Sequence, residues 1–264
     1  ATEIAESLSS MNEKRRRTER SIFESASERA RELGMTGGDR RAIVIADESW
    51  HTGVVGIVCS RLVSAFGRPA ILMQRDGEIC KGSARSIDGF NLHGALAQCA
   101  EHLETFGGHD MAAGLSLRAE NLDAFVERFT DVCNGAITEE MLTPALRIDC
   151  VAHADELTPR AVNQLLDLGP FGARNPQPTI LLRGVRPTRN ASPFGRNGEH
   201  MNLHVRAGSR ELRFVAWRWG DRREALRAGT EMDVVVRPKL STWKGNTRVE
   251  PEIRDVALAQ EMAT

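Results

Sequence analysis

Residues 42–73 read AIVIADESWHTGVVGIVCSRLVSAFGRPAILM. Two short apolar runs, 42–46 and 70–73, flank a helical pattern that extends from Gly53 to Phe66. Gly67 and Pro69 end the helical pattern, because glycine suits a helix C-cap and proline cannot continue a helix. A strand, a helix and a second strand in this order predict an α/β domain.

The same alternation continues to about residue 168. Asp76-Gly77 is a strong hairpin signal, and the returning strand is expected over 78–81. Asn91 is a good N-cap for a helix that we expect to run to Phe106 and to end at Gly107. A strand over 111–117 and a helix over 120–133 complete the pattern, which predicts a layered α/β domain with a mixed sheet over residues 35–168.

A long helix is predicted before this domain, over residues 2–33. Its apolar positions are mostly three or four residues apart, but the stripe lapses between Met11 and Ile22 into a charged segment. Such a helix would cross solvent between two domains, so we interpret residues 1–34 as a connector. Its basic run is balanced by acidic residues of the same helix, which favours a solvated face over a DNA contact.

From Gly169 the chain changes character, because prolines recur and short strand-like runs alternate with turns. We predict a small all-β barrel such as an OB-fold over residues 169–264. The run 211–219 has strand composition, and a period of two places Arg213, Val215, Trp217 and Trp219 on one face.

Charge is distributed unevenly along the chain. Residues 170–254 contain 17 Lys and Arg against 8 Asp and Glu, a net charge of +9, although the whole chain has a net charge of −1. Only this part suits a polyanion, and a basic surface without a partner is the alternative.

We find no apolar run near the roughly 18 residues of a membrane span. The five scattered cysteines argue against disulfides and zinc and favour a cytoplasmic location. The opening Ala1-Thr2-Glu3 has neither an initiator methionine nor a secretory signal, which suggests a fragment.

Three segments of the α/β domain are candidates for phosphate binding. In KGSARS (81–86), Ser83 and Arg85 offer a hydroxyl and a guanidinium beside small residues. An ordinary strand-to-helix turn is the competing reading of this segment. In FGGHD (106–110), Gly107 and Gly108 precede His109, which either donates to a phosphate or follows a helix C-cap as a structural residue. His51 precedes a helix whose N-terminal amides are suited to an anion.

The basic module carries aromatic residues among its arginines. Trp217, Trp219 and Trp243 lie near Arg218 and Lys244, and this combination of stacking faces and cations holds single strands without reading their sequence. Tryptophans buried in the core are the alternative; we expect at least one of the three to belong to the core and Trp243, beside the turn signal Lys244-Gly245-Asn246, to be the most exposed. No metal-ligand or nucleophile motif is visible, so no catalytic residue is assigned.

Together these segments closely resemble the DHHA1 domain and OB-fold of RecJ exonucleases. The resemblance rests on WHTGVVGIVCSRL (50–62), GSARS (82–86), FNLH (90–93), FGGH (106–109), GPFGARNP (169–176) and WKGN (243–246). The helix of residues 2–33 is similar to the family's connector between its DHH and DHHA1 domains. The resemblance therefore covers nearly the whole chain and leaves out the DHH domain.

The resemblance implies a role in 5′-3′ degradation of single-stranded DNA during repair and recombination. Mn²⁺ or Mg²⁺ in the missing DHH domain would activate the attacking water, so enzyme activity is expected of the parent and is uncertain for this chain. By motif, Ser83 and Arg85 would contact the phosphate at or near the 5′ end, and His109, Gly107 and Gly108 would line the substrate side of the cleft. Implied partners are single-stranded DNA and the DHH domain, with single-stranded-DNA-binding protein or a helicase as further candidates.

Two other functions are consistent with parts of this pattern. DHHA1 domains also occur in phosphodiesterases that cleave nanoRNA or cyclic dinucleotides, but those resemble only the first domain. A nucleic-acid-binding module without enzyme activity, such as a tRNA-handling DHHA1 appendage, is the second alternative. A specific preference for a 5′ phosphate at Ser83 and Arg85 would argue against the second alternative.

Overall fold

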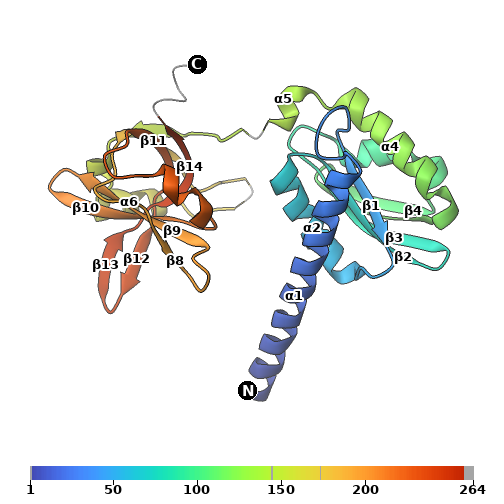
Figure 1. Cartoon of the computed structure of the whole chain (residues 1–264), viewed down its shortest axis with the longest axis horizontal. Coiled ribbons are helices and arrows are strands. Elements are labelled where there is room, and N and C mark those ends of the chain that lie inside the picture. The colour runs from blue at the N-terminus through green and yellow to red at the C-terminus, as the bar shows by residue number, and fades with distance from the viewer. Residues whose placement is uncertain (1, 144, 173, 259–264) are drawn as a thin grey trace. The chain divides into compact units, whose positions relative to one another are not determined.

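The computed structural model describes residues 2–143, 145–172 and 174–258. The chain forms two compact units, unit 1 (Ala1–Ala145) and unit 2 (Leu146–Thr264), and each unit has its own core (Figure 1). In the described part of the chain, no helix is both long and apolar enough to cross a membrane.

Unit 1 is a mixed α/β structure built around a five-stranded sheet with the order β1-β2-β3-β5-β4. Strands β1 and β2 are parallel, and the other neighbouring strands are antiparallel. Its elements are α1 (Thr2–Glu32), β1 (Ile43–Asp47), α2 (Thr52–Phe66), β2 (Ala70–Asp76), β3 (Ile79–Arg85), α3 (Leu92–Ala97), the 3-10 helix η1 (Ala100–His102), β4 (Thr105–His109), β5 (Ala112–Arg118), η2 (Ala119–Asn121), α4 (Leu122–Ala136) and α5 (Glu139–Leu142).

The sheet of unit 1 is covered by helices on both faces. Alternate residues of a strand point to opposite faces, so Ile43 and Ile45 pack with α1 and α2 while Val44 packs with α3 and α4. The C-terminal half of α1 contributes Ile22 and Ala26 to the first of these cores, whereas its N-terminal half extends beyond the sheet (Figure 1). The long helix and the layered mixed sheet that the sequence predicts are therefore confirmed.

The expected helix over residues 91–106 is wrong. Asn91 caps a helix as predicted, with its Oδ1 accepting the N–H of Gly94 at 2.7 Å, but α3 ends at Ala97. Residues 105–109 form strand β4, which pairs with β5 across the two-residue connection between His109 and Ala112. Gly107 therefore lies in a strand and does not cap a helix. The paired glycines resemble the end of a helix, so the local pattern points away from the short hairpin that this segment forms with β5.

The segment 81–86 also differs from its expected conformation. Gly77 has a φ of +56° in the β2–β3 turn, which confirms the hairpin, but β3 continues to Arg85 instead of ending near Lys81. Ser83 and Arg85 consequently lie on a strand and not in a strand-to-helix turn. The regular alternation of the strand places both side chains on the same face of the sheet.

Unit 2 is built around a seven-stranded sheet with the order β6-β7-β11-β14-β10-β9-β8 and a separate hairpin, β12–β13. Its elements are β6 (Cys150–Ala152), η3 (Ala154–Glu156), α6 (Pro159–Leu166), β7 (Ile180–Val185), β8 (Ser192–Phe194), β9 (His200–Ala207), β10 (Arg210–Ala216), η4 (Gly220–Ala225), β11 (Met232–Arg237), β12 (Leu240–Trp243), β13 (Asn246–Val249) and β14 (Glu252–Leu258).

Five strands of unit 2 have the pairing of an OB-fold. Strand β10 is parallel to β14, and β7 and β9 are antiparallel to β11 and β10, respectively. The chain directly after β7 then meets β9, through a bridge between Pro187 and Val205 and a 2.8 Å hydrogen bond from the N–H of Thr188 to the carbonyl of His204. The sheet therefore curves back on itself, as in a partly open barrel.

Unit 2 begins earlier than the expected boundary at residue 168. Strand β6 pairs with β7, and Leu157 and Val162 are buried in the core of unit 2, so residues 146–168 pack with the β domain. The helical character of 159–166 resembles the preceding α/β pattern, and the sequence alone does not show which core buries it.

The predicted strand over 211–219 is too long. Strand β10 ends at Ala216, and Arg218 has a φ of +64°, which is incompatible with a continuing strand. Trp217 and Trp219 therefore do not extend the row of Arg213 and Val215.

Candidate nucleic-acid interface

Strand pairing in unit 1 brings the candidate phosphate-binding residues together on one face of the sheet. Ser83 pairs with Gly114 of β5, which in turn pairs with Gly107 of β4. In the next row on this face, Ala112 pairs with both Arg85 and His109. Directly paired residues share a face, so two segments more than 20 residues apart in sequence form one continuous surface.

Helix α2 packs beside this surface at Gly56. A Cβ atom at Gly56 would lie 3.2 Å from Nη2 of Arg85 and 3.3 Å from Oγ of Ser83. Glycine at this position thus allows the helix, the hydroxyl and the guanidinium to approach one another closely. Gly56 is one helical turn from the start of α2 at Thr52, so the three groups lie near the positive end of the helix dipole.

His51 is the N-cap of α2. Its Nδ1 accepts the backbone N–H of Gly53 at 3.0 Å, which satisfies one of the unpaired amides of the first turn. Trp50 before it is buried and anchors the start of the helix in the core. Because Nδ1 is the acceptor, the imidazole in its neutral form carries its proton on Nε2 and can donate to an anion.

Arg85 differs from the neighbouring arginines in its charge partners. Arg29 and Arg61 form ion pairs with Asp47 (2.6 Å) and Glu19 (3.1 Å). Among the residues that the structure describes, Arg85 has no carboxylate partner; its Nη1 donates only to the adjacent Ala84 carbonyl, at 2.8 Å. Its charge is therefore available to a ligand, whereas the other two arginines hold α1 against β1 and α2.

The fold requires glycine at position 108 but not at position 107. Gly108 has a φ of +143°, and a Cβ there would lie 2.3 Å from the carbonyl oxygen of Ala112, so the fold itself requires glycine. A Cβ at Gly107 would meet nothing within 4 Å, and its φ is not in the left-handed range. Gly107 is exposed, as is His109. The packing of the described chain does not explain Gly107.

A buried cysteine of α2 contacts the backbone of β3 at Ser83. Cys59 of α2 is buried and donates to the carbonyl of Ser83 at 3.1 Å. Burial raises the pKa of the Cys59 thiol to about 12, so the thiol stays protonated and keeps this hydrogen bond.

In unit 2, the β12–β13 hairpin projects from the curved sheet (Figure 1). Its two-residue turn is Lys244-Gly245, and both residues have positive φ, +49° and +79°, as a type I′ turn requires. Trp243, directly before the turn, is 69% exposed. The expectation that Trp243 is the most exposed of the three candidate tryptophans is confirmed.

The other two candidate tryptophans lie near the end of β10. Trp219 packs against the core of unit 2 and carries the guanidinium of Arg222 4.5 Å from its ring centroid. Trp217 is 46% exposed, and Arg218 is exposed as well. Trp219 thus has mainly a packing role, with Arg222 as a cation on its outer face.

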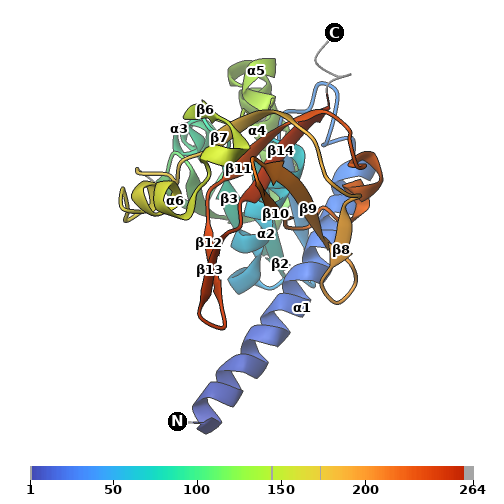
Figure 2. The same ribbon diagram turned by 90° about the vertical axis from the view of Figure 1, so that its left-hand side faces the viewer.

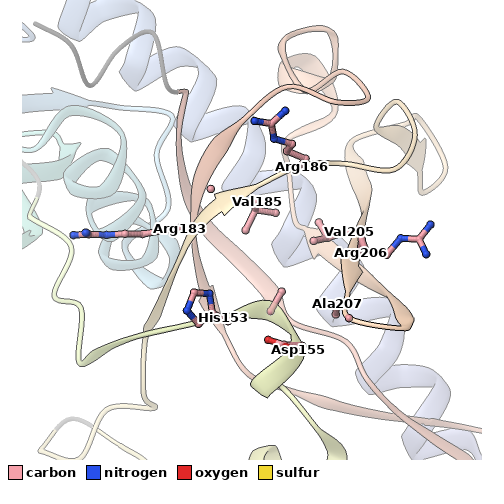
Figure 3. A pocket seen from close by; sticks show the side chains of 11 residues that line it. His153, Asp155, Arg183, Val185, Arg186, Val205, Arg206 and Ala207 are labelled. Atoms are coloured by element: carbon pink, nitrogen blue, oxygen red, sulfur yellow. The ribbon is translucent and has the colours of Figure 1, made fainter.

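A cleft of about 370 Å³ in unit 2 is lined by His153, Asp155 and three arginines, among other residues. Figure 3 shows the side chains of Arg183, Arg186 and Arg206 pointing away from the cleft in different directions. Arg186 is also paired with Glu231. The arginines do not converge, so this cleft is a weaker candidate for a phosphate site than the face that carries Ser83 and Arg85.

The described residues contain no group of three or more His, Cys, Asp or Glu side chains that could hold a metal ion. No metal-dependent step is assigned to the described residues.

Comparison with protein families divides the chain in the same way as its structure. The DHHA1 domain model matches residues 39–135, and the RecJ OB domain model matches residues 148–255. The first match lies within unit 1 and the second within unit 2.

The similar proteins found by comparison are named as RecJ exonucleases. The single-stranded-DNA-specific exonuclease RecJ of Bacillus subtilis is 33% identical over 98% of this chain, and that of Dickeya dadantii is 40% identical over 50% of it. The crystal structure of RecJ with Mg²⁺ from Thermus thermophilus matches 95% of the chain with a TM-score of 0.73 and 27% identity. The chain covers 33% and 24% of the two relatives and 37% of the crystallised chain, so it spans a third or less of the curated relatives' length.

Proposed function

We propose, from the premise that this chain belongs to the RecJ family through its DHHA1 and RecJ OB domains, that it is the strand-holding C-terminal part of a 5′-3′ single-stranded-DNA exonuclease. The relatives are named as exonucleases specific for single-stranded DNA. Because the chain covers only about a third of them, its proposed share of that activity is binding, in DNA repair and recombination.

The observation that carries the proposal is the position of Arg85, which has no carboxylate partner among the described residues. Its guanidinium lies with the Ser83 hydroxyl against Gly56, near the start of α2. A guanidinium fork and a hydroxyl at the positive end of a helix dipole suit a terminal phosphate. We assign the 5′ phosphate of the strand to this site, with His51 as a further donor at the helix start.

The open face beside the phosphate would receive the first nucleotides. Gly107 is exposed and has no steric reason to be glycine, so it allows a sugar-phosphate backbone to lie directly on β4. Gly108 permits the backbone conformation of β4. The exposed His109 lies in the same row of the sheet as Arg85 and can donate to a phosphate.

Unit 2 would hold the strand farther from its end. Trp243 and Lys244 at the hairpin tip combine a stacking face with a cation, and Arg218 adds a second exposed charge. Trp219 would contribute to binding indirectly, because its ring contacts the guanidinium of Arg222 and positions that charge. Such contacts bind single strands with little dependence on sequence.

Strand cleavage is proposed to reside outside these residues. The Thermus thermophilus RecJ has been crystallised with Mg²⁺ and with Mn²⁺, whereas the described residues here contain no group of three or more His, Cys, Asp or Glu side chains that could hold a metal ion. A DHH domain would supply the metal ions and would be the principal protein partner. Single-stranded-DNA-binding protein and a helicase are further proposed partners, and the cytoplasm is the proposed location.

The proposal is tested by titrating the chain with fluorescent oligonucleotides of one length, single-stranded and duplex, over a series of salt concentrations. We expect the single strand to bind more tightly and log affinity to fall by about 0.7 per contacted phosphate per log unit of salt. Equal affinity for the duplex, or no binding at low salt, would contradict the proposal.

A further inference from the structure

Three aromatic rings of unit 2 form a cluster that is separate from its core. The aromatic cluster consists of Phe194 at the end of β8, His200 at the start of β9 and Trp217 directly after β10. Trp217 lies edge-to-face with both other rings, at centroid distances of 5.5 Å to Phe194 and 4.8 Å to His200. Phe194 and His200 are 5.1 Å apart. Neither Phe194 nor Trp217 is among the residues that pack against the core of unit 2.

The backbone holds Trp217 in this position. Strand β10 ends at Ala216, and Arg218 adopts a φ of +64°, a conformation that few residues other than glycine take. The backbone N–H of Arg218 donates to Nδ1 of His200 at 3.1 Å, which supports this turn. The indole consequently packs on His200 at the surface, where 46% of Trp217 remains exposed.

A large exposed ring that is fixed by two other rings is pre-organised for stacking, because little conformational freedom is lost when a ligand binds. Cations lie beside the cluster: Arg218 is adjacent in sequence, and Arg196 lies in the β8–β9 connection, both exposed. One carboxylate, that of Glu199, lies 3.8 Å from Nε2 of His200, so the cluster is not uniformly basic.

The cluster is on the same side of unit 2 as the β12–β13 hairpin. In both views, β8 and the hairpin project from the same end of this unit (Figures 1 and 2). One strand of nucleic acid that contacts Trp243 can therefore continue across this end toward Phe194 and Trp217.

We propose that the aromatic cluster is a base-stacking site, in which Trp217 stacks on an unpaired base while Arg218 neutralises a neighbouring phosphate. This inference rests on the proposed function; it assigns the stacking role to Trp217 and adds Phe194 and His200 to the residues that hold the strand. Stacking on an aromatic side chain tolerates every base, so the site serves strands of any sequence.

The test compares the affinity of the wild-type chain and Trp217→Ala for two fluorescent 5′-phosphorylated strands of equal length, oligo(dT) and an abasic strand. We expect the substitution to weaken oligo(dT) binding by about fivefold or more and to change abasic-strand binding less than about twofold. Leu168→Ala is the matched control, because Leu168 is also an exposed apolar residue of unit 2, 60% exposed, and should change neither affinity.

Trp217→Phe retains an aromatic face and should recover most of the affinity, whereas Trp217→Leu retains apolar bulk and should not. These variants also test the site if Trp217→Ala proves unstable by circular dichroism. Equal losses on both strands, or full affinity in Trp217→Leu, would overturn the inference. If wild type binds oligo(dT) and Trp217→Ala binds it equally well, only the stacking site fails; if wild type binds neither strand, the proposed function fails with it.

Discussion

Replacing Arg85 with alanine should remove most of the preference of the chain for a 5′ phosphate. Hydrogen bonds to charged groups contribute about 1.5–3 kcal/mol, which corresponds to roughly 10- to 150-fold in Kd. Arg85 is only partly buried, so solvent screening places the expected loss near the lower end, about 10- to 30-fold. The loss should apply to the 5′-phosphorylated strand, while the 5′-hydroxyl strand should lose about threefold or less.

Stability should change little in this variant. Within the described chain, Arg85 donates only to the carbonyl of Ala84, and a single such bond contributes about 1 kcal/mol or less at a partly exposed site. Arg85→Lys keeps the charge but not the planar fork, so it should recover only part of the preference.

The assay is fluorescence anisotropy with paired oligonucleotides that differ only in the 5′ group. Arg75→Ala is the matched control, because Arg75 is an exposed arginine near the other end of the same hairpin and its removal changes the net charge equally. Equal losses for the two oligonucleotides in Arg85→Ala, or a loss of the same size in Arg75→Ala, would refute end recognition by Arg85.

Four further substitutions test separate parts of the account. Gly56→Ala adds a Cβ 3.2 Å from Arg85 Nη2, so the 5′-phosphate preference should fall although helix propensity improves; an unchanged preference with an unchanged Tm would count against the site. Gly107→Ala should leave the Tm within a few degrees and weaken strand binding, whereas Gly108→Ala should lower stability by about 2 kcal/mol or more, because its Cβ overlaps a carbonyl. Trp243→Ala should weaken single-strand binding by about 1–3 kcal/mol at constant Tm, and unaltered affinity in the folded variant would make this residue irrelevant to binding.

Local sequence patterns predict much of unit 1, because its strands and helices carry their own signals. The 42–73 segment forms strand, helix and strand within a residue or two of the expected bounds at most ends, since its apolar runs, Gly67 and Pro69 act locally. By contrast, the local pattern of 105–109 predicts the end of a helix, and only its pairing with β5 makes it a strand.

The candidate site can be predicted only as separate segments. Ser83, Arg85 and His109 are identifiable from their motifs, but sheet register places them on one face, and register cannot be inferred from local sequence. No sequence signal marks Gly56 as a site residue, because its role appears only when α2 packs against β3. The same holds for Phe194 and His200, which become a cluster through the turn at Arg218.

The most direct test of the central claim is photocrosslinking of the wild-type chain with two 5′-phosphorylated single strands, one with a photoreactive base at the 5′ terminus and one with it in the middle. The crosslinked peptides are then identified by mass spectrometry. If the chain holds the strand by its 5′ end, the terminal probe should crosslink to unit 1 near residues 83–85 and 107–109, and the central probe to unit 2. Crosslinks that do not depend on probe position, or a terminal probe that reacts mainly with unit 2, would contradict the account.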